Sequence, residues 1–501
     1  MSGGGSYDLL AVGNMDKVLT ANPTSTFWRS VHKRHTPFAL ESQSQPFGTS
    51  CVFGQESQIL LNRVGDLCYH CYLHVRLPSI VACDTNIPEQ CGGLAQPGQY
   101  PTASDGSTAC NPCASQDEKA LVDFLPADYS ALSYEQKAER MREAKDAMRR
   151  ERYGSARELG CCTEGDEDCP DNSCPELGDT WACYTNDIGH FLTKKCKLLI
   201  GGQEVDRLWS LYLYLWEELS GRSGRRLTEL TGRRFTRSQL ICDAREEREL
   251  YIPLPFFWTV NTGSALPLAS LAYHGVSMHI EFESLNKLIM VSGAHVAVRN
   301  GRTGLGLTPN DLIAELEVTY VYLSNEERDK FASSSFEQLI IQCQHYFKTE
   351  NKAHCRIPLS FNHPCLEMLI AVRRQCQEKA NNWSNLSGPF GRDPITHAEL
   401  LLNTTSRFGK KPALYWRGVV PYQHHSNIPD THCYVMSFAL NPECHTLAEP
   451  SGSCNLSRID NIELVLDMDP ALADEPYTVY VFARTWNLIR YKDGVAGAAY
   501  Q

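Results

Sequence analysis

The sequence has no long uninterrupted run of apolar residues. Its most apolar stretch, residues 288–298, is short and is broken by Ser292, Gly293 and His295, whereas a membrane-spanning helix needs about 20 apolar residues in a row. The first residues also lack the basic start and the apolar core of a secretory signal peptide. We therefore expect a soluble protein whose contact with any membrane is peripheral.

Positive charge is scarce as well. The chain has 47 Lys and Arg residues against 59 Asp and Glu residues, which gives a net charge of −12, and neither end carries a basic arm. Nucleic-acid binding depends on positive side chains that contact phosphates. We therefore expect no nucleic acid among the partners of this chain.

The familiar sequence motifs of enzymes are absent. The chain contains no GxSxG, HExxH, P-loop or GxGxxG pattern. Its paired carboxylates, Glu217–Glu218 and Glu246–Glu247, stand in ordinary charged runs. We therefore expect no catalytic site, no cofactor and no enzymatic activity.

Two short motifs carry side chains that can bind metals or exchange protons. The segment HHSNIPDTH contains His424, His425 and His432, and we interpret it as a polar turn before the next strand. The CYHC motif has the spacing of a redox pair, but alternation within a strand places Cys68 and Cys71 on opposite faces. Neither motif therefore predicts a working site.

Cysteine, by contrast, is abundant. The chain has 21 cysteines, of which 13 lie within residues 51–196. Free thiols or metal ligands are the usual state of cysteines in a chain without a secretory signal. Cys110 and Cys113 form a CNPC pair, and Cys161 and Cys162 follow downstream, so these four are candidate zinc ligands. Their spacings match no standard zinc finger, and disulfides remain the third alternative.

A strand signal stands near the middle of the chain. From residue 276 to 283 apolar and polar residues alternate strictly, which is typical of a strand with one buried face. Before it, Pro253 and Pro255 remove backbone donors from one edge, which favours an edge strand. The sequence NTGS at residues 261–264 predicts a turn. We therefore predict two long strands joined by a short turn within residues 251–283.

Similar signals recur on both sides of this stretch. The first half has further strand candidates at residues 24–31, 51–61, 65–77, 190–200 and 313–323. A GlyGly turn at residues 201–202 leads into a helical spacing of leucines that Gly221 ends. The second half has seven candidates, at residues 339–347, 353–361, 365–373, 396–402, 433–440, 459–466 and 477–488. Two blocks of about eight short strands predict an all-β protein with two sandwiches in tandem.

Residues 79–180 interrupt this pattern. They are rich in Gly, Pro, Cys and acidic residues and show little alternation. Within them, residues 133–153 favour a charged surface helix, with Ser133 as its cap and Gln136 as the capping-box partner. We interpret the segment as a long insertion between two strands of the first sandwich.

Five distinctive blocks follow one another along the chain. They are residues 16–39 (DKVLTANPTSTFWRSVHKRHTPFA), 186–207 (ending in IGGQEVDR), 251–283 (with IPLPFFW), 437–460 (SFALNPECHTLAEPSGSCNLSRID) and 480–500 (YVFARTWNLIRYKDGVAGAAY). In this order they resemble the major capsid proteins of nucleocytoplasmic large DNA viruses. The chain departs from that family mainly at residues 79–180, where members usually have a much shorter loop.

The resemblance implies a double jelly roll, that is, two tandem eight-stranded antiparallel sandwiches. The expected parts are an N-terminal arm at residues 1–23, a first jelly roll at residues 24–325 and a second at residues 333–501. The Cys-rich, partly helical insertion at residues 79–180 is expected between strands D and E of the first roll, as an outer tower. In the same lettering, residues 251–283 are expected to be strands F and G.

The resemblance also implies a function and partners. The expected protein is a structural major capsid protein, produced late in infection, assembled in the host cytoplasm and incorporated in the virion. Its homotrimers would form pseudo-hexagonal capsomers of an icosahedral shell, beside neighbouring capsomers, minor capsid proteins and penton proteins. The arm would run toward the minor capsid proteins, and an internal viral membrane would be touched only indirectly. The alternative is a lectin-like surface protein, a carbohydrate-binding β-sandwich in which Trp383 and Trp416 stack on sugars.

Modification follows from the same resemblance. Viruses of this family often encode a thiol oxidase, which favours disulfides in the insertion, each stabilising by about 2–4 kcal/mol. The disulfide candidates are Cys91, Cys110, Cys113, Cys161, Cys162, Cys169, Cys174 and Cys183. The sequons at Asn382 and Asn385, in a segment that resembles an outer loop of the second roll, are the glycosylation candidates.

Overall fold

The computed structural model describes residues 34–84, 181–221, 227–292, 296–444, 449–472 and 475–500, with Leu10 and Asn22 in addition. The chain divides into two compact units, Met1–Phe38 and Ala39–Gln501, and almost all of the described structure belongs to the second. The strand expected at residues 24–31, the helix expected at residues 133–153 and nearly all of the insertion lie outside the described residues.

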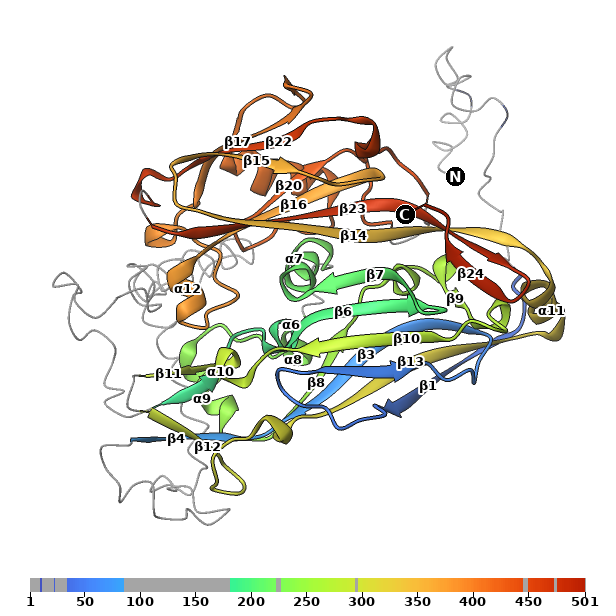
Figure 1. The fold of residues 1–501 in the computed structure, drawn as a ribbon, viewed down its shortest axis with the longest axis horizontal. Coiled ribbons are helices and arrows are strands. Elements are labelled where there is room, and N and C mark those ends of the chain that lie inside the picture. Colours follow the sequence, from blue (N-terminus) through green and yellow to red (C-terminus); the bar gives the residue numbers. More distant parts are fainter. Residues whose placement is uncertain are drawn as a thin grey trace, which may run out of the picture. The chain divides into compact units, whose positions relative to one another are not determined.

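The first half of the larger unit contains two antiparallel sheets (Figure 1). One has the strand order β1-β13-β3-β8, with the short β9 (Leu266–Pro267) also paired to β3. Its strands are β1 (Phe38–Pro46), β13 (Ile313–Leu323), β3 (Leu67–Leu77) and β8 (Arg248–Pro253). The other has the order β2-β10-β6-β7. Its strands are β2 (Glu56–Leu60), β10 (Val276–Phe282), β6 (Thr193–Ile200) and β7 (Gln203–Trp209).

The second half contains two sheets as well. One has the order β14-β23-β16-β20, with bounds Phe336–Glu350, Tyr477–Lys492, Pro364–Arg374 and Cys433–Ser437. The other has the order β15-β22-β17-β18, with bounds His354–Leu359, Ile462–Met468, Ile395–Leu402 and Thr405–Ser406. Short strands extend these sheets, namely β19 (Lys411–Pro412), β21 (Cys454–Asn455) and β24 (Val495–Ala498).

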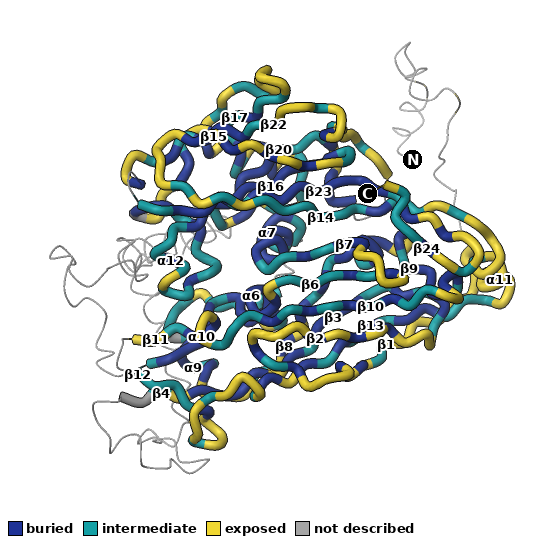
Figure 2. Tube along the Cα trace, viewed as in Figure 1, coloured by how far each residue is buried: buried dark blue, intermediate teal, exposed yellow. Residues whose placement is uncertain are grey.

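The two halves share one topology. When the main strands of each half are numbered along the chain, both halves have the orders first-eighth-third-sixth and second-seventh-fourth-fifth. The predicted β structure with antiparallel pairing is therefore confirmed, and the predicted β13 matches in both bounds. The predicted alternation of β10 is confirmed as well, because its residues are alternately buried and partly exposed. Figure 2 shows the buried positions along the central strands of both halves.

Residues 251–283 differ from the prediction of two strands around a short turn. β8 ends at Pro253 and β10 begins only at Val276, and the two strands lie in different sheets. The residues between them form short 3₁₀ turns around the buried ring of Trp258. β8 and β10 are the sixth and seventh main strands of the first half, so the expected letters F and G hold when the eight strands are lettered from A. The edge-strand prediction is confirmed, since β8 lies at the edge of its sheet.

The strand expected at residues 190–200 starts later than predicted. One helical turn, α6 (Ile188–Leu192), precedes β6, and all five of its residues are buried. An apolar run that is buried on every side has no period that distinguishes a helix from a strand. The GlyGly turn that follows is confirmed, with φ of 59° at Gly201 and 81° at Gly202. A side chain at Gly201 would place a Cβ 2.4 Å from Nδ1 of His274, so only glycine fits there.

Short helices and ribbons complete the described structure. The helices include α7 (Ser210–Ser220), α8 (Thr228–Thr231), α9 (Arg237–Ala244), α11 (Asn325–Ser333), α12 (Gln375–Lys379), η8 (Tyr415–Val419) and α13 (Val420–His424). Two ribbons hold the ends of the insertion, β4 (Ile80–Asp84) with β12 (Val296–Asn300) and β5 (Ala182–Tyr184) with β11 (Ile289–Val291). Within the described ranges, no helix is long and apolar enough to cross a membrane.

Candidate functional site: the buried seam around helix α7

Helix α7 joins the two halves of the chain. Its sequence, SLYLYLWEELS, is apolar around most of its circumference, and eight of its residues are buried. A helix that is apolar on all sides needs neighbours on all sides. Figure 1 shows α7 between β7 of the first half and β14 of the second. We call the contacts of α7 and β7 with the second half the seam.

Aromatic side chains form the centre of the seam. The ring of Tyr212 lies 5.8 Å from that of Phe482, and the Arg484 guanidinium lies 3.7 Å from the centre of the Trp216 ring. Both β23 residues stand on the face of their sheet that points away from the core of the second half. Desolvated cation–π contacts of this kind stabilise by about 2 kcal/mol. The seam therefore covers the outer face of the β14-β23-β16-β20 sheet.

Three buried ionisable groups follow behind Arg484, namely Glu367, His425 and Glu443. Its Nη1 donates to Glu367 Oε1 at 2.6 Å and to the Pro442 carbonyl at 2.8 Å. His425 Nε2 lies 2.8 Å from Glu367 Oε2, and His425 Nδ1 lies 3.2 Å from Glu443 Oε1. Two cations thus alternate with two carboxylates in a region from which solvent is excluded. We call these four side chains the Glu367 network.

The charges of this network depend on one another. Burial disfavours charge on Glu367 and on His425, but each is stabilised by its oppositely charged neighbours. The result is a lowered pKa for Glu367 and a pKa of about 9 for His425. Glu367 and His425 are therefore both ionised at neutral pH, and loss of one member of the network would leave an unpaired charge in the interior.

A single carboxylate closes the free edge of β14. Asp206 Oδ1 accepts hydrogen bonds from the backbone N–H groups of Arg207 at 2.9 Å and of Cys343 at 3.1 Å. The side chain of Gln342 also donates to the Val205 carbonyl of β7. Burial raises the pKa of Asp206 to about 7, against the opposing effect of the two backbone donors. An edge strand that could otherwise pair with another chain is thus occupied within the same chain.

A second buried cluster holds the other side of α7 to the first half. His190 Nε2 lies 3.0 Å from Glu217 Oε2, while Arg233 pairs with Glu218 and, at 3.8 Å, with Asp187. Burial raises the pKa of Asp187 to about 6; it opposes charge on His190, whose pKa is nevertheless raised by Glu217. The prediction that Glu217–Glu218 belongs to an ordinary charged run is therefore wrong. The partners of Glu217 and Glu218 are His190 and Arg233, which lie outside the charged run, so the run alone did not predict that the two carboxylates are buried.

The end of α7 also holds the HHSNIPDTH segment. Asn427 donates from its backbone to the Leu219 carbonyl at 3.1 Å and from Nδ2 to the Glu218 carbonyl at 2.8 Å. The segment is a turn as predicted, but its middle histidine, His425, is buried in the Glu367 network. His432 is partly buried, and its desolvation lowers its pKa to about 4. Among the described residues, no group of side chains has the arrangement of a metal site.

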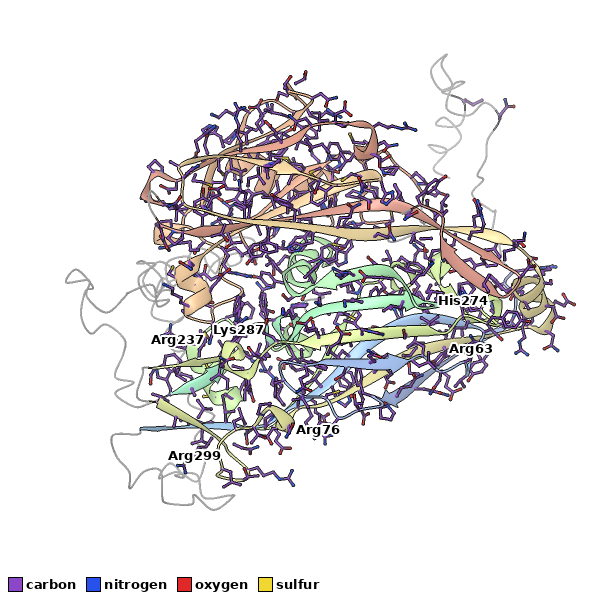
Figure 3. All side chains as sticks on the ribbon, viewed as in Figure 1. Arg63, Arg76, Arg237, His274, Lys287 and Arg299 are labelled. Atoms are coloured by element: carbon purple, nitrogen blue, oxygen red, sulfur yellow. The ribbon has the colours of Figure 1, made fainter. Side chains whose placement is uncertain are left out.

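Further contacts join the halves away from α7. His274 Nδ1 lies 2.9 Å from the Ala496 carbonyl, beside a backbone bond from Tyr273 to Gly494 of 2.9 Å. Trp383 Nε1 donates to the Lys287 carbonyl at 2.6 Å. Figure 3 labels His274 and Lys287 and shows that they belong to different regions of the first half. The two halves therefore form one continuous packed body.

The cysteine predictions have different outcomes. Cys68 and Cys71 are both buried in the core, which contradicts their expected placement on opposite faces. A bulge opposite Thr319 and Tyr320 shifts the register of β3 by one residue and explains the difference. Both are free thiols. Cys183 is a buried free thiol on β5, and burial raises its pKa to about 12. The other candidates lie outside the described residues: Cys91, Cys110, Cys113, Cys161, Cys162, Cys169 and Cys174.

The sequons at Asn382 and Asn385 and the tryptophans of the lectin-like alternative lie within the described residues. Asn382 is only 7% exposed, and Asn385 uses its Oδ1 to accept from the backbone N–H of Ser387 at 3.0 Å. Trp416 is buried and donates to the Ala398 carbonyl at 3.2 Å. It therefore has no exposed ring on which a sugar could stack.

Comparison with known proteins places this architecture in a family. Residues 26–90 and 170–324 match the protein family described as "Major capsid protein N-terminus". Residues 327–497 match the family described as "Large eukaryotic DNA virus major capsid protein". The chain belongs to the major capsid proteins of large eukaryotic DNA viruses. The expected resemblance is thereby confirmed, and with it a structural rather than an enzymatic protein. The matched stretches leave out residues 91–169, which fall within the expected insertion.

Individual members of the family are similar along their whole length. The chain is 28% identical to the major capsid protein of Pyramimonas orientalis virus over 99% of both chains. It superposes on a chain of the PBCV-1 virus capsid with a TM-score of 0.64, at 20% identity over 95% of this chain and 100% of that one. It superposes on the Faustovirus major capsid protein with a TM-score of 0.65, at 12% identity over 96% of this chain and 94% of that one. These likenesses show that the fold is that of capsid proteins.

Proposed function

We propose that this major capsid protein forms trimeric, pseudo-hexagonal capsomers of an icosahedral shell. The observation that carries the proposal is the repeated strand order of the two halves, together with the seam that holds them as one body. Each half has the strand order of an eight-stranded jelly roll, a fold that viral capsids use. Two similar bodies per chain give six per trimer, which supports a six-sided outline.

The outer parts of the chain have roles in the same proposal. Residues 79–180 form an external tower, supported by their position between the two ribbons at one end of the first half. The N-terminal arm, residues 1–23, contacts minor capsid proteins, and penton proteins occupy the vertices. The internal membrane is touched only indirectly, and assembly takes place in the host cytoplasm.

The covalent state of the tower belongs to the same proposal. Disulfides among its cysteines compensate for a small apolar core. Mass spectrometry of the purified protein without reducing agent tests this point, because disulfides lower the mass by about two hydrogens per bridge and zinc raises it. Glycans at Asn385 would appear in the same spectra.

Light scattering and electron microscopy of the purified full chain test the main proposal. A particle with three times the chain mass and a six-sided outline is the expected result. A stable monomer that binds glycans would contradict it and favour the lectin-like alternative. A density map in which residues 79–180 face the membrane would contradict the tower alone.

A further inference from the structure

The seam covers only one of two equivalent sheets. In the β14-β23-β16-β20 sheet, all residues of β16 except the two at its ends are buried, so both faces of this strand are covered. In the equivalent β1-β13-β3-β8 sheet, the residues of β3 alternate between buried and partly exposed over most of its length. The outer face of this sheet, which we call the open face, therefore remains accessible in a single chain.

The open face carries rings suited to contact with a protein. His70, Tyr72 and His74 point outward from β3, and the exposed Tyr251 of β8 stacks on His74 with 4.3 Å between ring centres. The exposed Ile313 begins β13 in the same sheet. Aromatic residues of this kind are enriched at protein interfaces and present rigid contact area at small entropic cost.

The second half has its own counterpart of α7. Helix α7 lies between the fifth and sixth strands of the first half, and residues 413–432, with η8 and α13, lie at the equivalent place in the second half. Where Tyr212 and Trp216 of α7 are only 3% and 7% exposed, Leu414 and Tyr422 of the counterpart are 65% and 77% exposed. We call the exposed side of residues 413–432 the free helix face.

The free helix face is larger than two residues. Val419 is exposed beside it, and the exposed Leu440 is joined to it because its carbonyl lies 3.1 Å from Nδ1 of His424. Contiguous apolar side chains on a surface are typical of protein contacts. On the inner side, the buried Trp416 and Val420 fix the segment to the second half.

Two buried contacts hold this face in place before any partner arrives. His425, which follows α13 directly, lies between Glu367 and Glu443, and Asn427 is bound to the end of α7. A surface that is already ordered loses little conformational entropy on binding. The seam of one chain therefore also supports the segment that carries the free helix face.

Cations lie beside the free helix face. Residues 405–412, which precede it, carry Arg407, Lys410 and Lys411 and no acidic residue, while Arg417 within it is paired with Asp393 at 3.0 Å. The outward residues of the open face include Glu249, Glu315 and Glu317. Its cation Arg76, which is labelled in Figure 3, is paired with Glu249 at 2.7 Å. Complementary charges around a contact favour the correct partner over others.

We propose that the free helix face docks on the open face of a second copy of this chain, as α7 docks on the covered sheet within one chain. The proposal rests on the proposed function, because assembly with other copies is what brings the two surfaces together. Each copy gives one helix face and receives one, so the contact is heterologous and closes when copies form a ring. The contact between chains would thus repeat the contact within a chain.

Photo-crosslinking of the full-length protein tests the docking directly. Tyr422 is replaced by benzoylphenylalanine, and assembled protein containing light and heavy isotope-labelled copies is irradiated and digested. We expect crosslinks between light and heavy copies that join position 422 to peptides from β3, β8 or β13. Crosslinks only to residues 405–432 of another copy, or only to a different surface, would overturn the proposal.

A variant of the free helix face separates this inference from the proposed function. The double variant Leu414→Asp with Tyr422→Asp should weaken association at least about tenfold, since central interface residues dominate binding. The matched control is Leu305→Asp, at a leucine that is 70% exposed and lies outside both surfaces, and it should change association less than about twofold. Unchanged association of the double variant would overturn the inference while the shell function stands. A wild-type chain that never associates would overturn both.

Discussion

The β14-β23-β16-β20 and β1-β13-β3-β8 sheets have the same topology but different surroundings. The first lies under α7 and its strand β16 is buried on both faces, whereas the second keeps one face open. Their central strands reflect this difference, because residues 365–372 of β16 read CLEMLIAV and residues 67–77 of β3 read LCYHCYLHVRL. A strand covered on both faces gives a continuous apolar run, and a strand covered on one face alternates. The pattern of a strand therefore reports its neighbours as well as its sheet.

The two sheets also differ in whether their ion pairs are buried or exposed. The covered sheet holds Glu367 and Arg484 in a fully buried network, while the open face holds Arg76 and Glu249 as an exposed pair. Buried ion pairs cost desolvation and need complete partners, whereas exposed pairs contribute little. The covered sheet is therefore the place where a single substitution should have the largest effect.

Of the substitutions considered, removal of the buried cation Arg484 should lower the free energy of unfolding most. Arg484→Met keeps a long apolar side chain over Trp216 but leaves Glu367 with His425 as its remaining cation. We expect a loss of about 3–5 kcal/mol in the free energy of unfolding, measured by denaturant titration. The matched control is Arg490→Met on the same strand, whose exposed pair with Glu337 should contribute less than about 1 kcal/mol. Equal losses would show that the network is not a buried, coupled unit.

Tyr212 of α7 and Tyr422 of α13 lie at equivalent places in the two halves, and their substitution should have different effects on stability. Tyr212→Ala should destabilise the chain by about 3 kcal/mol, because a buried ring against Phe482 is lost. Tyr422→Ala should change the unfolding free energy of the single chain by less than about 0.5 kcal/mol, since its ring is exposed. Thermal and denaturant unfolding of both variants at low protein concentration measures the contrast. A large cost at Tyr422 would mean that its ring is packed within the chain.

The stability of the seam should depend on pH. The pKa of Asp206 is raised from 3.8 to about 7 and that of His425 from 6.5 to about 9. Both folded-state values exceed the unfolded ones, so each contribution is complete below the unfolded pKa and is lost as pH rises through the folded pKa. We expect the wild type to lose stability between about pH 4 and pH 9 through these two groups.

Asp206→Asn isolates one of the two titrations. Asparagine keeps an oxygen that accepts from the backbone N–H groups of Arg207 and Cys343 but cannot ionise. We expect the variant to match the wild type at pH 4 and to exceed it by about 1–3 kcal/mol at pH 8, measured by denaturant titration. The same difference at both pH values would contradict a buried carboxylate at this place.

A small effect is expected on the open face. Tyr251→Ser should cost about 0.5–1 kcal/mol in the single chain, because only the stack with His74 is lost. The equivalent edge strand of the covered sheet contains the buried Val435, and Val435→Ser should cost about 2 kcal/mol or more. Unfolding experiments on the two variants compare the sheets position by position. Equal costs would mean that the two faces are covered alike.

The sequence predicted most of the long strands well, whether one face or both faces of the strand are buried. β10 and β13 alternate, and β14, β15, β16, β17, β20, β22 and β23 all match candidates of the second half. The spacing of apolar residues did not predict the conformation where tertiary contacts decide it. The buried turn α6 has no distinguishing period, and the bulge in β3 moves Cys68 and Cys71 to the same side.

The seam itself was beyond prediction from local sequence. Glu367 is 58 residues from His425 and 117 residues from Arg484, so no local motif joins them. Glu217 and Glu218 stand in a run that is typical of a surface helix, and only their distant partners His190 and Arg233 explain their burial. The family resemblance predicted the architecture, whereas the charged network could be recognised only in the folded structure.

Hydroxyl-radical footprinting of the separated and the assembled full chain tests the central claim most directly. Tyr72, Tyr251 and Tyr422 should react in separated chains and become protected on assembly, because the open face and the free helix face meet only between copies. Tyr212 and Trp216 should be protected in both states, since the seam is complete within one chain. Continued reaction at Tyr251 and Tyr422 in the assembled protein would contradict the account.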